Sequence, residues 1–389
     1  MPQPRAGALP THPTRSADDP ESQVPGANAR RDPIPDAPRP AVARTVIRES
    51  VKNATAVQTA AVNSMDTATP PASNNPTYDA FSDMLADLSR LGQSANPFNV
   101  PPLSTGAAAI GLPGHFIDAS YTNDAGTRDY KLYIPSTYAG QPAPLLVMLH
   151  GCTQNPDDFA LGTGMNALAE EHGCLVAYPA QSQQANATRC WNWFSATDQQ
   201  RGQGEPAILA GLTQDIMARY VIDPGHVFVA GLSAGGAMAA ILGTLYPDLY
   251  TAVGVHSGLP FAAANDLPSA MAAMKGEFRS HHKPGKSLPI IVFHGDRDTT
   301  VHPANGDELI KRRRRHPSED VVVEPGTVQD GHAYTRTVHK RPDGSIHAEH
   351  WVIHGSGHAW SGGDTRGTYT DGKGPNASRE MMRFFRTAR

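Results

Sequence analysis

The chain has 389 residues and a formal net charge of -4 at pH 7. This length allows one large domain or two smaller ones, and the charge gives no basic surface of the kind that nucleic-acid-binding proteins need. The sequence has no apolar run of about 18 residues, the length of a transmembrane helix, so we predict no transmembrane segment.

The N-terminal segment differs in composition from the rest of the chain. Ten of the 34 prolines lie in residues 1–40, and residues 1–76 contain no Phe, Tyr, Trp or Cys. Such a segment has too little apolar surface to compensate the entropy lost on ordering. We therefore predict a disordered Pro-rich arm over 1–76. A basic region followed by an apolar run, as in a secretory signal peptide, is not visible in it.

Residues 77–100 are predicted to form one short amphipathic helix and a linker. Apolar side chains recur there at helical spacing, and the helix is expected to end at Gly92. Packing on the main domain and docking to a partner or an apolar surface both fit this pattern. The remaining residues, 101–389, have the size of a single α/β enzyme domain.

The domain is expected to begin with a β-hairpin. Alternating runs at 115–121 and 127–134 flank Asn123-Asp124-Ala125-Gly126, which has the composition of a turn. The apolar run 143–149 is typical of a strand that is buried on both faces. Residues 157–172 then have the pattern of one helix, and residues 174–178 that of the next strand.

Strands and helices alternate through the middle of the chain. We predict helices at 205–220 and 234–245 and strands at 226–230, 252–256 and 289–293. This alternation forces parallel pairing with right-handed crossovers, so we predict an α/β fold with a doubly wound, mostly parallel sheet and helices on both faces. Residues 259–288 are a candidate cap or lid over the site.

The C-terminal third is expected to add a helix, a second hairpin and a terminal helix. The cations at 311–315 close a helix that begins near Asn305, a position that suits the helix dipole better than it suits a nucleic-acid patch. Alternating runs at 332–339 and 345–354 flank a Pro-Asp-Gly turn. Residues 377–387 are predicted to form the terminal helix.

The segment Gly231-Leu232-Ser233-Ala234-Gly235 lies between a predicted strand and a predicted helix. This setting is that of a nucleophile elbow, in which glycines flank the serine because a Cβ would strike the neighbouring strand or helix. A Gly-x-Ser-x-Gly outside such a setting is more often a structural loop. We therefore predict that Ser233 is a nucleophile exposed above the sheet.

A serine nucleophile needs a general base within hydrogen-bond reach and an acid that orients the base. In the α/β-hydrolase order the acid follows the strand 289–293, at Asp296 or Asp298. We choose Asp298 because it lies where the chain turns away, and Asp296 is then a turn-forming carboxylate. His358 is the predicted base, since it lies in a Gly-rich loop after a strand.

Two backbone N–H groups usually stabilise the oxyanion of the tetrahedral intermediate. Ala234 follows the nucleophile and supplies one, and Cys152, in the loop after the strand 143–149, is predicted to supply the second.

Cys152 and Cys190 both flank the expected active-site loops, so we hypothesise a disulfide between them, which requires an oxidising compartment. Cys174 is expected to be a buried small hydrophobe.

The loop 190–194 lies between a strand end and a helix, where α/β folds place substrate-contacting loops. We predict that Trp191 or Trp193 lines the cleft and that the other is core, although burial of both is the common fate of large aromatics.

His350 and His354 lie on the same face of one strand, but no carboxylate or cysteine completes a metal site at ligand spacing. We therefore predict no metal.

Four motifs occur in register along the chain: Leu149-His150-Gly151-Cys152-Thr153-Gln154, Arg189-Cys190-Trp191-Asn192-Trp193-Phe194, Gly231-Leu232-Ser233-Ala234-Gly235-Gly236 and Gly357-His358-Ala359-Trp360-Ser361-Gly362-Gly363. With them the chain resembles the poly(3-hydroxybutyrate) depolymerase family of esterases over 114–385. The resemblance implies an α/β-hydrolase fold, no cofactor, and a secreted serine esterase acting on short-chain polyhydroxyalkanoate polymer or oligomers. It also implies a triad of Ser233, Asp298 and His358 with oxyanion donors Cys152 and Ala234.

Other functions share parts of this pattern. Relatives in the same family cleave feruloyl or acetyl esters of plant polysaccharides. A serine peptidase on the same fold would share the triad, whereas a catalytically silent binding protein would share only the fold. The family implies secretion, but no signal peptide is visible, so an extracellular and a cytoplasmic location both stay open.

Overall fold

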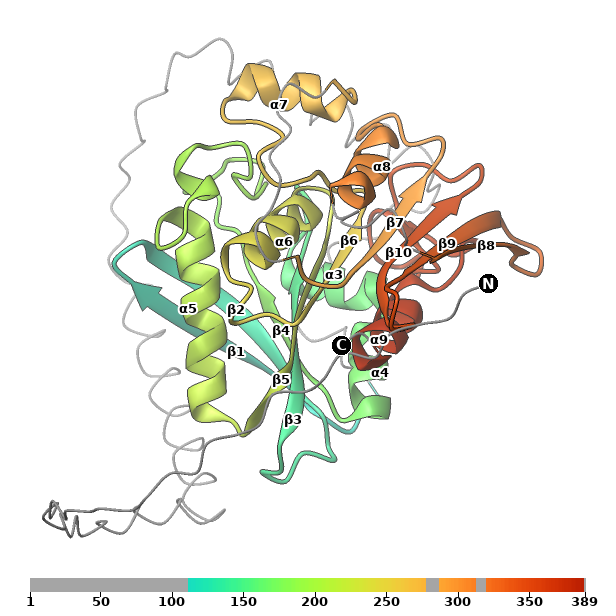
Figure 1. Ribbon diagram of the computed structural model, residues 1–389. Coiled ribbons are helices and arrows are strands. Elements are labelled where there is room, and N and C mark those ends of the chain that lie inside the picture. The colour runs from blue at the N-terminus through green and yellow to red at the C-terminus, as the bar shows by residue number, and fades with distance from the viewer. Residues whose placement is uncertain (1–110, 278–286, 313–319, 388–389) are drawn as a thin grey trace, which may run out of the picture. The chain divides into compact units, whose positions relative to one another are not determined.

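The computed structural model describes residues 111–277, 287–312 and 320–387, and the predicted arm, helix and linker over 1–100 lie outside the described residues. The main strands are β1 (His115–Asn123), β2 (Gly126–Ile134), β3 (Ala143–Leu149), β4 (Leu175–Pro179), β5 (Ile222–Leu232), β6 (Ala252–His256), β7 (Ile290–Gly295), β8 (Asp320–Thr327), β9 (Ala333–Lys340) and β10 (Ile346–Ile353). Within the described part of the chain they form one 10-stranded sheet in the order β1-β2-β4-β3-β5-β6-β7-β10-β9-β8 (Figure 1).

The middle of this sheet is parallel and its two edges are antiparallel. Each neighbouring pair from β4 through β3, β5, β6 and β7 to β10 is parallel. The hairpin β1–β2 and the pairs β2–β4, β9–β10 and β8–β9 are antiparallel. The predicted doubly wound, mostly parallel sheet and the two predicted hairpins are therefore confirmed.

Helices cover both faces of the sheet, as predicted (Figure 1). Their bounds are α3 (Pro156–Thr163), α4 (Met165–His172), α5 (Gly204–Arg219), α6 (Ala234–Leu245), α7 (Leu267–Met274), α8 (Ala304–Lys311) and α9 (Ala377–Thr387). Alternate side chains of β3 point to opposite faces. Leu145 and Val147 pack in the hydrophobic cluster that includes α5 and α6, whereas Leu146 and Met148 pack in the cluster that includes α3, α4 and α9. This two-sided burial explains why β3 is apolar throughout.

The single helix predicted over 157–172 is wrong. The structure has two helices there, α3 and α4, which meet at Gly164. Gly164 adopts a left-handed conformation with a φ of 61°, and its N–H donates to the carbonyl of Ala160. A glycine in this conformation ends a helix by satisfying its last carbonyls, so the apolar periodicity continues although the helix does not.

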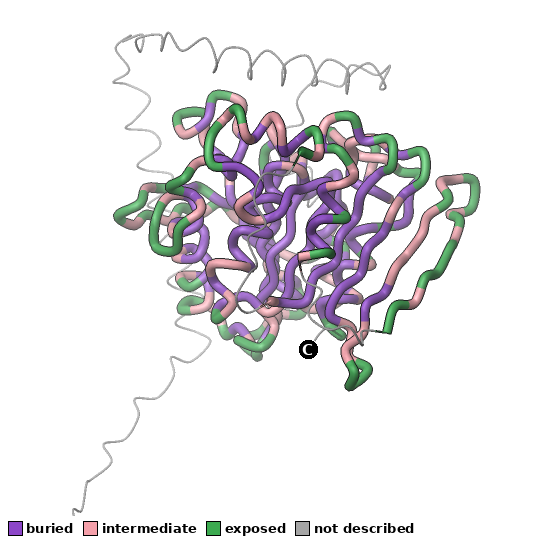
Figure 2. The backbone as a smooth tube through the Cα atoms, turned by 45° about the horizontal axis from the view of Figure 1, so that its top comes forward, coloured by how far each residue is buried: buried purple, intermediate pink, exposed green. Residues whose placement is uncertain are grey.

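Other elements lie close to their expected places. Helix α8 ends at Lys311, and residues 313–319 lie outside the described residues. Strand β8, which the sequence analysis did not predict, forms one edge of the sheet and is mostly exposed, whereas the buried residues are concentrated in the central strands (Figure 2). Within the described ranges, no helix combines the length and hydropathy needed to cross a membrane.

The topology brings the predicted site residues to one edge of the sheet. Cys152 follows β3, Ser233 follows β5, Asp298 follows β7 and His358 follows β10. Because these four strands run parallel, their C-terminal ends meet at the same edge, where open α/β sheets bind ligands.

Candidate active site

Ser233 occupies a strained turn between β5 and α6. Its φ is 57° and its ψ is -120°, and its N–H donates to the carbonyl of His256 at 2.9 Å. A Cβ on Gly231 would lie 2.4 Å from the carbonyl carbon of Gly235, and a Cβ on Gly235 would lie 2.0 Å from the carbonyl oxygen of Leu149. Only glycine fits at both positions, which is the steric reason that the sequence predicted for the Gly-x-Ser-x-Gly pattern.

Asp298 and His358 form a hydrogen-bonded pair. His358 Nδ1 donates to Asp298 Oδ2 at 2.7 Å, while Asp298 Oδ1 accepts the N–H groups of Thr300 and Val301 at 2.9 and 2.8 Å. Because Nδ1 carries the proton, Nε2 of a neutral His358 is the nitrogen that accepts one. Burial alone would raise the pKa of Asp298, but the attraction of His358 and the hydrogen bonds from His294 and His358 hold this pKa well below its usual range.

His294 is a contact of Asp298 that the sequence analysis did not identify. Its Nε2 lies 2.8 Å from the carbonyl oxygen of Val301 and 3.4 Å from Asp298 Oδ2. Both neighbours are acceptors, so Nε2 carries a proton and contributes a further donor to the acid. The residue stands at the end of β7, four positions before Asp298, but sequence spacing alone does not reveal this contact.

The other candidate acid, Asp296, has a different partner. Its Oδ2 accepts from His354 Nδ1 at 3.0 Å and its Oδ1 accepts the N–H of Gly355 at 2.7 Å. This pair is exposed, whereas Asp298 is 4% exposed. His350 is buried, with its Nδ1 3.8 Å from Asp307 Oδ1, whereas His354 is exposed and pairs with Asp296. The described residues hold no group of three His, Cys, Asp or Glu side chains suited to a metal.

Ser233 and His358 open into the same pocket, which has a volume of about 600 Å³ including its open mouth. Most of its lining is apolar. The lining residues are Gly151, Cys152, Thr153, Trp193, Leu232, Ser233, Ala234, Leu259, Met274, Thr300, Val301, His358 and Tyr369. All the predicted site residues except Asp298 and Trp191 are in this set, and Asp298 reaches the pocket through His358.

The loop after β3 contributes Gly151, Cys152 and Thr153 to the lining of this pocket. The N–H of Gly151 donates to Gln154 Oε1 at 2.9 Å, and the N–H of Thr153 donates to the carbonyl of Thr188 at 2.7 Å. Between them, the N–H of Cys152 has no hydrogen-bond partner among the described residues. Ala234 is the first residue of α6, so its N–H lacks an acceptor within the helix. Both residues predicted as oxyanion donors thus line the pocket, and the N–H of neither has a hydrogen-bond partner among the described residues.

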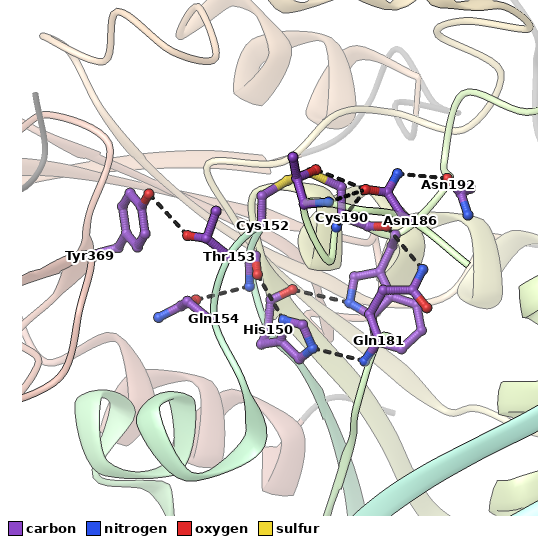
Figure 3. The surroundings of a disulfide bond; sticks show 12 residues. His150, Cys152, Thr153, Gln154, Gln181, Asn186, Cys190, Asn192 and Tyr369 are labelled. Carbon is purple, nitrogen blue, oxygen red and sulfur yellow. Dashed lines mark hydrogen bonds between the residues drawn. A yellow bond between two sulfur atoms is a disulfide. The ribbon is translucent and has the colours of Figure 1, made fainter. Parts of the chain in front are cut away.

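His150 supports the same loop from below (Figure 3). Its Nε2 accepts the N–H of Gln181 at 3.0 Å, so Nδ1 carries the proton and donates to the carbonyl of Gly151 at 2.7 Å. Burial lowers the pKa of His150 to about 4, which keeps the ring neutral near pH 7. His150 is therefore a structural residue of this loop.

A disulfide joins Cys152 to Cys190, which confirms the predicted pairing and ties the loop after β3 to the tryptophan loop (Figure 3). Cys174 is a buried free cysteine, also as predicted, and burial raises the pKa of its thiol to about 12.

The two tryptophans of this loop have different surroundings. Trp193 lines the pocket, although it is only 4% exposed and packs in the same hydrophobic cluster as Trp191. Trp191 is 0% exposed, and its indole Nε1 donates to the carbonyl of His150 at 3.1 Å. Both tryptophans are therefore buried, as is common for large aromatics, and Trp193 is the one that also reaches the pocket. Contact of Trp191 with a substrate in this pocket does not fit, because its ring and its N–H are both used in the core.

Three pocket residues had no clear signal in the sequence. Leu259 and Met274 belong to the segment 259–288 that was predicted as a cap, but no periodicity singles them out. Tyr369 comes from the loop between the short strands β11 (Trp360–Ser361) and β12 (Thr370–Asp371), and its hydroxyl lies 3.3 Å from Thr153 Oγ1. The two residues are 216 positions apart in the chain, so a local sequence pattern could not predict this contact.

Comparison with known proteins identifies relatives of this chain. Residues 128–318 match the family described as Esterase PHB depolymerase. Poly(3-hydroxyalkanoate) depolymerase C from Paucimonas lemoignei is 31% identical over 254 residues, which cover 61% of this chain and 59% of that protein. A probable acetylxylan esterase A from Aspergillus flavus is 28% identical over 200 residues, which cover 46% of this chain and 64% of that protein. The match thus spans less than two thirds of either relative.

The fold has a counterpart among solved structures. An acetyl xylan esterase from Aspergillus awamori superposes with a TM-score of 0.55 and 19% identity, covering 71% of this chain and 100% of the other. This likeness supports the α/β-hydrolase fold that the sheet order indicates. Residues 128–318, just under half of the chain, thus match the family of PHB depolymerase esterases.

Proposed function

We propose that this protein is a serine carboxylic ester hydrolase that acts through an acyl-enzyme on Ser233, with short-chain polyhydroxyalkanoate polymer or oligomers as its substrates. One observation carries the proposal. Ser233, held on a strained elbow, opens into the same pocket as His358, whose ring is oriented by the buried Asp298. A nucleophile, a base and an acid in this arrangement are the requirements of acyl transfer.

The reaction follows from these positions. As Ser233 Oγ attacks the ester carbonyl carbon, His358 Nε2 accepts the hydroxyl proton and Asp298 stabilises the imidazolium. The N–H groups of Cys152 and Ala234 bind the oxyanion. When the intermediate collapses, the ester C–O bond breaks and His358 returns the proton to the leaving alkoxide.

Water completes the cycle. His358 takes a proton from a water molecule, whose oxygen attacks the acyl carbon, and then protonates Ser233 Oγ as the carboxylic acid leaves. Backbone dipoles supply the charge stabilisation in both half-reactions, so the scheme needs no cofactor.

The pocket lining supports an aliphatic ester as the substrate. Trp193, Leu259, Met274 and Val301 form an apolar wall, and the hydroxyl side chains of the lining besides Ser233 are those of Thr153, Thr300 and Tyr369. Apolar walls contribute binding through the area that they remove from water. The similarity to a poly(3-hydroxyalkanoate) depolymerase supports the same substrate class.

An acetylxylan-type carbohydrate esterase is the second candidate. The 28% identity to a probable acetylxylan esterase A over 46% of this chain favours it. The chemistry at Ser233 would be the same, and the difference lies in the alcohol half of the ester. The disulfide between Cys152 and Cys190 suits action in an oxidising compartment in either case.

A substrate panel tests the proposal. Hydroxybutyrate oligomers, poly(3-hydroxybutyrate) film, acetylated xylan and methyl ferulate are compared for the unaltered protein and for Ser233→Ala. We expect the highest kcat/KM on hydroxybutyrate oligomers and none of these activities in Ser233→Ala. Preference for acetylated xylan would favour the second candidate, and hydrolysis that persists in Ser233→Ala would contradict a serine mechanism.

A further inference from the structure

Glu205 is a buried carboxylate outside the catalytic groups. It lies in the first turn of α5 and is 4% exposed. Its Oε1 accepts from Arg128 Nη2 of β2 at 3.1 Å, from Gln181 Nε2 and from Asn192 Nδ2 at 2.9 Å. Its Oε2 accepts the main-chain N–H of Asn192 at 2.8 Å. One carboxylate thus connects a strand, a helix and the tryptophan loop.

The contacts at Asn192 bear directly on the pocket. Asn192 immediately precedes Trp193, which lines the same pocket as Ser233. Glu205 holds both the main chain and the side chain of Asn192, so it fixes the backbone one residue away from the indole. The loop between β4 and the short helix η2 (Thr197–Gln199) has no sheet or helix partner for these polar groups, and a buried side chain supplies it instead.

A second branch of the network reaches the loop after β3. Gln181 donates through Nε2 to Glu205 and to the carbonyl of Cys190 at 2.9 Å. Its main-chain N–H donates to His150 Nε2, and His150 in turn holds Gly151 (Figure 3). In addition to this hydrogen bond, the disulfide with Cys152 restrains Cys190 covalently. Asn192 lacks such a covalent restraint. Its side chain also contacts Asn186 and the carbonyl of Ala185, and its carbonyl accepts the N–H of Ser195, but Glu205 is the acceptor of its main-chain N–H.

We propose that Glu205 is a positioning residue that holds Trp193 as a wall of the pocket and thereby determines the preference for extended esters over short ones. This inference rests on the proposed esterase function. A short p-nitrophenyl ester occupies the space next to Ser233, whereas an oligomer extends along the apolar wall. Displacing the wall therefore weakens binding of the oligomer more than binding of the short ester.

The charges around Glu205 allow a pH test of this role. The ionisable groups that face it are Arg128 from β2 and Asp198 from η2, whose Oδ1 accepts the N–H of Glu205 at 2.6 Å. Burial and then the charge of Asp198 raise the pKa of Glu205 to about 7, against the opposing effects of Gln181, Asn192 and Arg128. Glu205 therefore changes its charge in the range where an esterase is assayed.

The position of the added proton follows from the hydrogen bonds. Oε1 faces three donors, whereas Oε2 faces only the N–H of Asn192. A proton on Oε2 would face one opposing donor, the N–H of Asn192, whereas a proton on Oε1 would face three. Protonation of Oε2 therefore costs less. Protonation thus weakens Oε2 as an acceptor of the Asn192 N–H and loosens the backbone next to Trp193.

The experiment compares two substrates across pH. The measured quantity is the ratio of kcat/KM for a hydroxybutyrate trimer to kcat/KM for p-nitrophenyl acetate, from about pH 5.5 to about pH 8.5. Ionisation of His358 affects both substrates and cancels in the ratio. For the unaltered protein we expect the ratio to fall by about tenfold as the pH decreases through about 7, mainly through KM of the trimer. In Glu205→Gln the ratio is low and independent of pH.

Two further variants distinguish loss of the Glu205 contacts from misfolding of Glu205→Gln. Glu205→Gln removes the counterion of the buried Arg128 and risks misfolding. Asn192→Ala keeps that ion pair and the main-chain bond to Glu205, loses the Nδ2 contact with Glu205 together with the side-chain hydrogen bonds to Asn186 and Ala185, and is expected to lower the ratio by a smaller factor. Gln200→Ala, an exposed amide in the same region that does not touch Glu205, is the matched control and keeps the full ratio and its pH dependence.

The outcomes separate the two proposals. A ratio that does not change with pH and is the same in Asn192→Ala as in the unaltered protein overturns the role of Glu205 and leaves the esterase function intact. Failure of the unaltered protein to hydrolyse either ester overturns the proposed function and this inference with it.

Discussion

Asp298 and His358, 60 positions apart in the chain, are joined by a hydrogen bond of 2.7 Å from Nδ1 to Oδ2. A second pair, Asp296 and His354, stands beside it with a hydrogen bond of 3.0 Å but does not line the pocket. The two pairs differ in burial, and the molecule thus contains its own control for the assignment of the acid.

Asp298→Asn should lower kcat for p-nitrophenyl butyrate by about a thousandfold or more, because the amide disturbs the tautomer and orientation of His358. Asp296→Asn, the matched control, should change kcat by less than about fivefold. Steady-state kinetics on both variants decide the point. If Asp296→Asn is the more damaging substitution, the acid has been assigned to the wrong carboxylate.

Gln154 is expected to preserve the geometry of the oxyanion site. Its Oε1 accepts a hydrogen bond from the N–H of Gly151, while its Nε2 donates to Asp158 and to the carbonyl of Thr368. Gln154→Ala leaves the N–H of Gly151 without an acceptor, so kcat should fall by roughly 10- to 100-fold with little change in KM.

The control for this change is Gln141→Ala, which removes an exposed amide far from the pocket lining and should leave kcat intact. An increase in KM at constant kcat in Gln154→Ala would show that Gln154 serves ground-state binding and not the oxyanion site.

The disulfide should be detectable by thiol titration. Denatured protein that has been exported to an oxidising compartment and not reduced should contain one reactive thiol, that of Cys174. Replacing both Cys152 and Cys190 by alanine should lower the free energy of unfolding by about 2–4 kcal/mol. Cys174→Ala, as a comparison, should abolish the remaining thiol signal. Three reactive thiols in the unaltered protein would contradict the bridge.

The two tryptophans should differ in their effect on substrate preference and not in their effect on stability. Trp191→Ala empties a fully buried site and should lower the free energy of unfolding by about 3–5 kcal/mol. Trp193→Ala also empties a buried site and should lower it by a similar amount, but this variant alone should weaken turnover of long oligomers more than that of a short p-nitrophenyl ester. Chemical denaturation and kinetics on both variants test this, and full oligomer activity in Trp193→Ala would refute it.

Local patterns predicted much of this structure. The elbow at Ser233 could be predicted because its steric requirement is met by two glycines within five residues of sequence, and the sheet could be predicted because strand and helix alternate. Asp298 and His358 followed from the order in which this fold supplies its groups. These features depend on neighbours in the chain or on topology.

The missed features depend on contacts between distant segments. Glu205 and Gln154 have roles only through partners in other loops, such as the contact of Gln154 with Thr368, 214 positions away. The break at Gly164 was missed because apolar periodicity continues across a left-handed glycine. The spacing of apolar residues predicts which face of a helix or strand is buried, but it does not predict which loops are in contact.

Covalent labelling with diethyl p-nitrophenyl phosphate tests the central claim most directly. The reagent phosphorylates an activated serine and stops ester hydrolysis. Intact-mass and peptide analysis should find one diethylphosphoryl group per chain, on Ser233, with loss of p-nitrophenyl butyrate hydrolysis in proportion to labelling. Labelling at another residue, or full hydrolysis by a chain that is fully labelled on Ser233, would contradict Ser233 as the nucleophile.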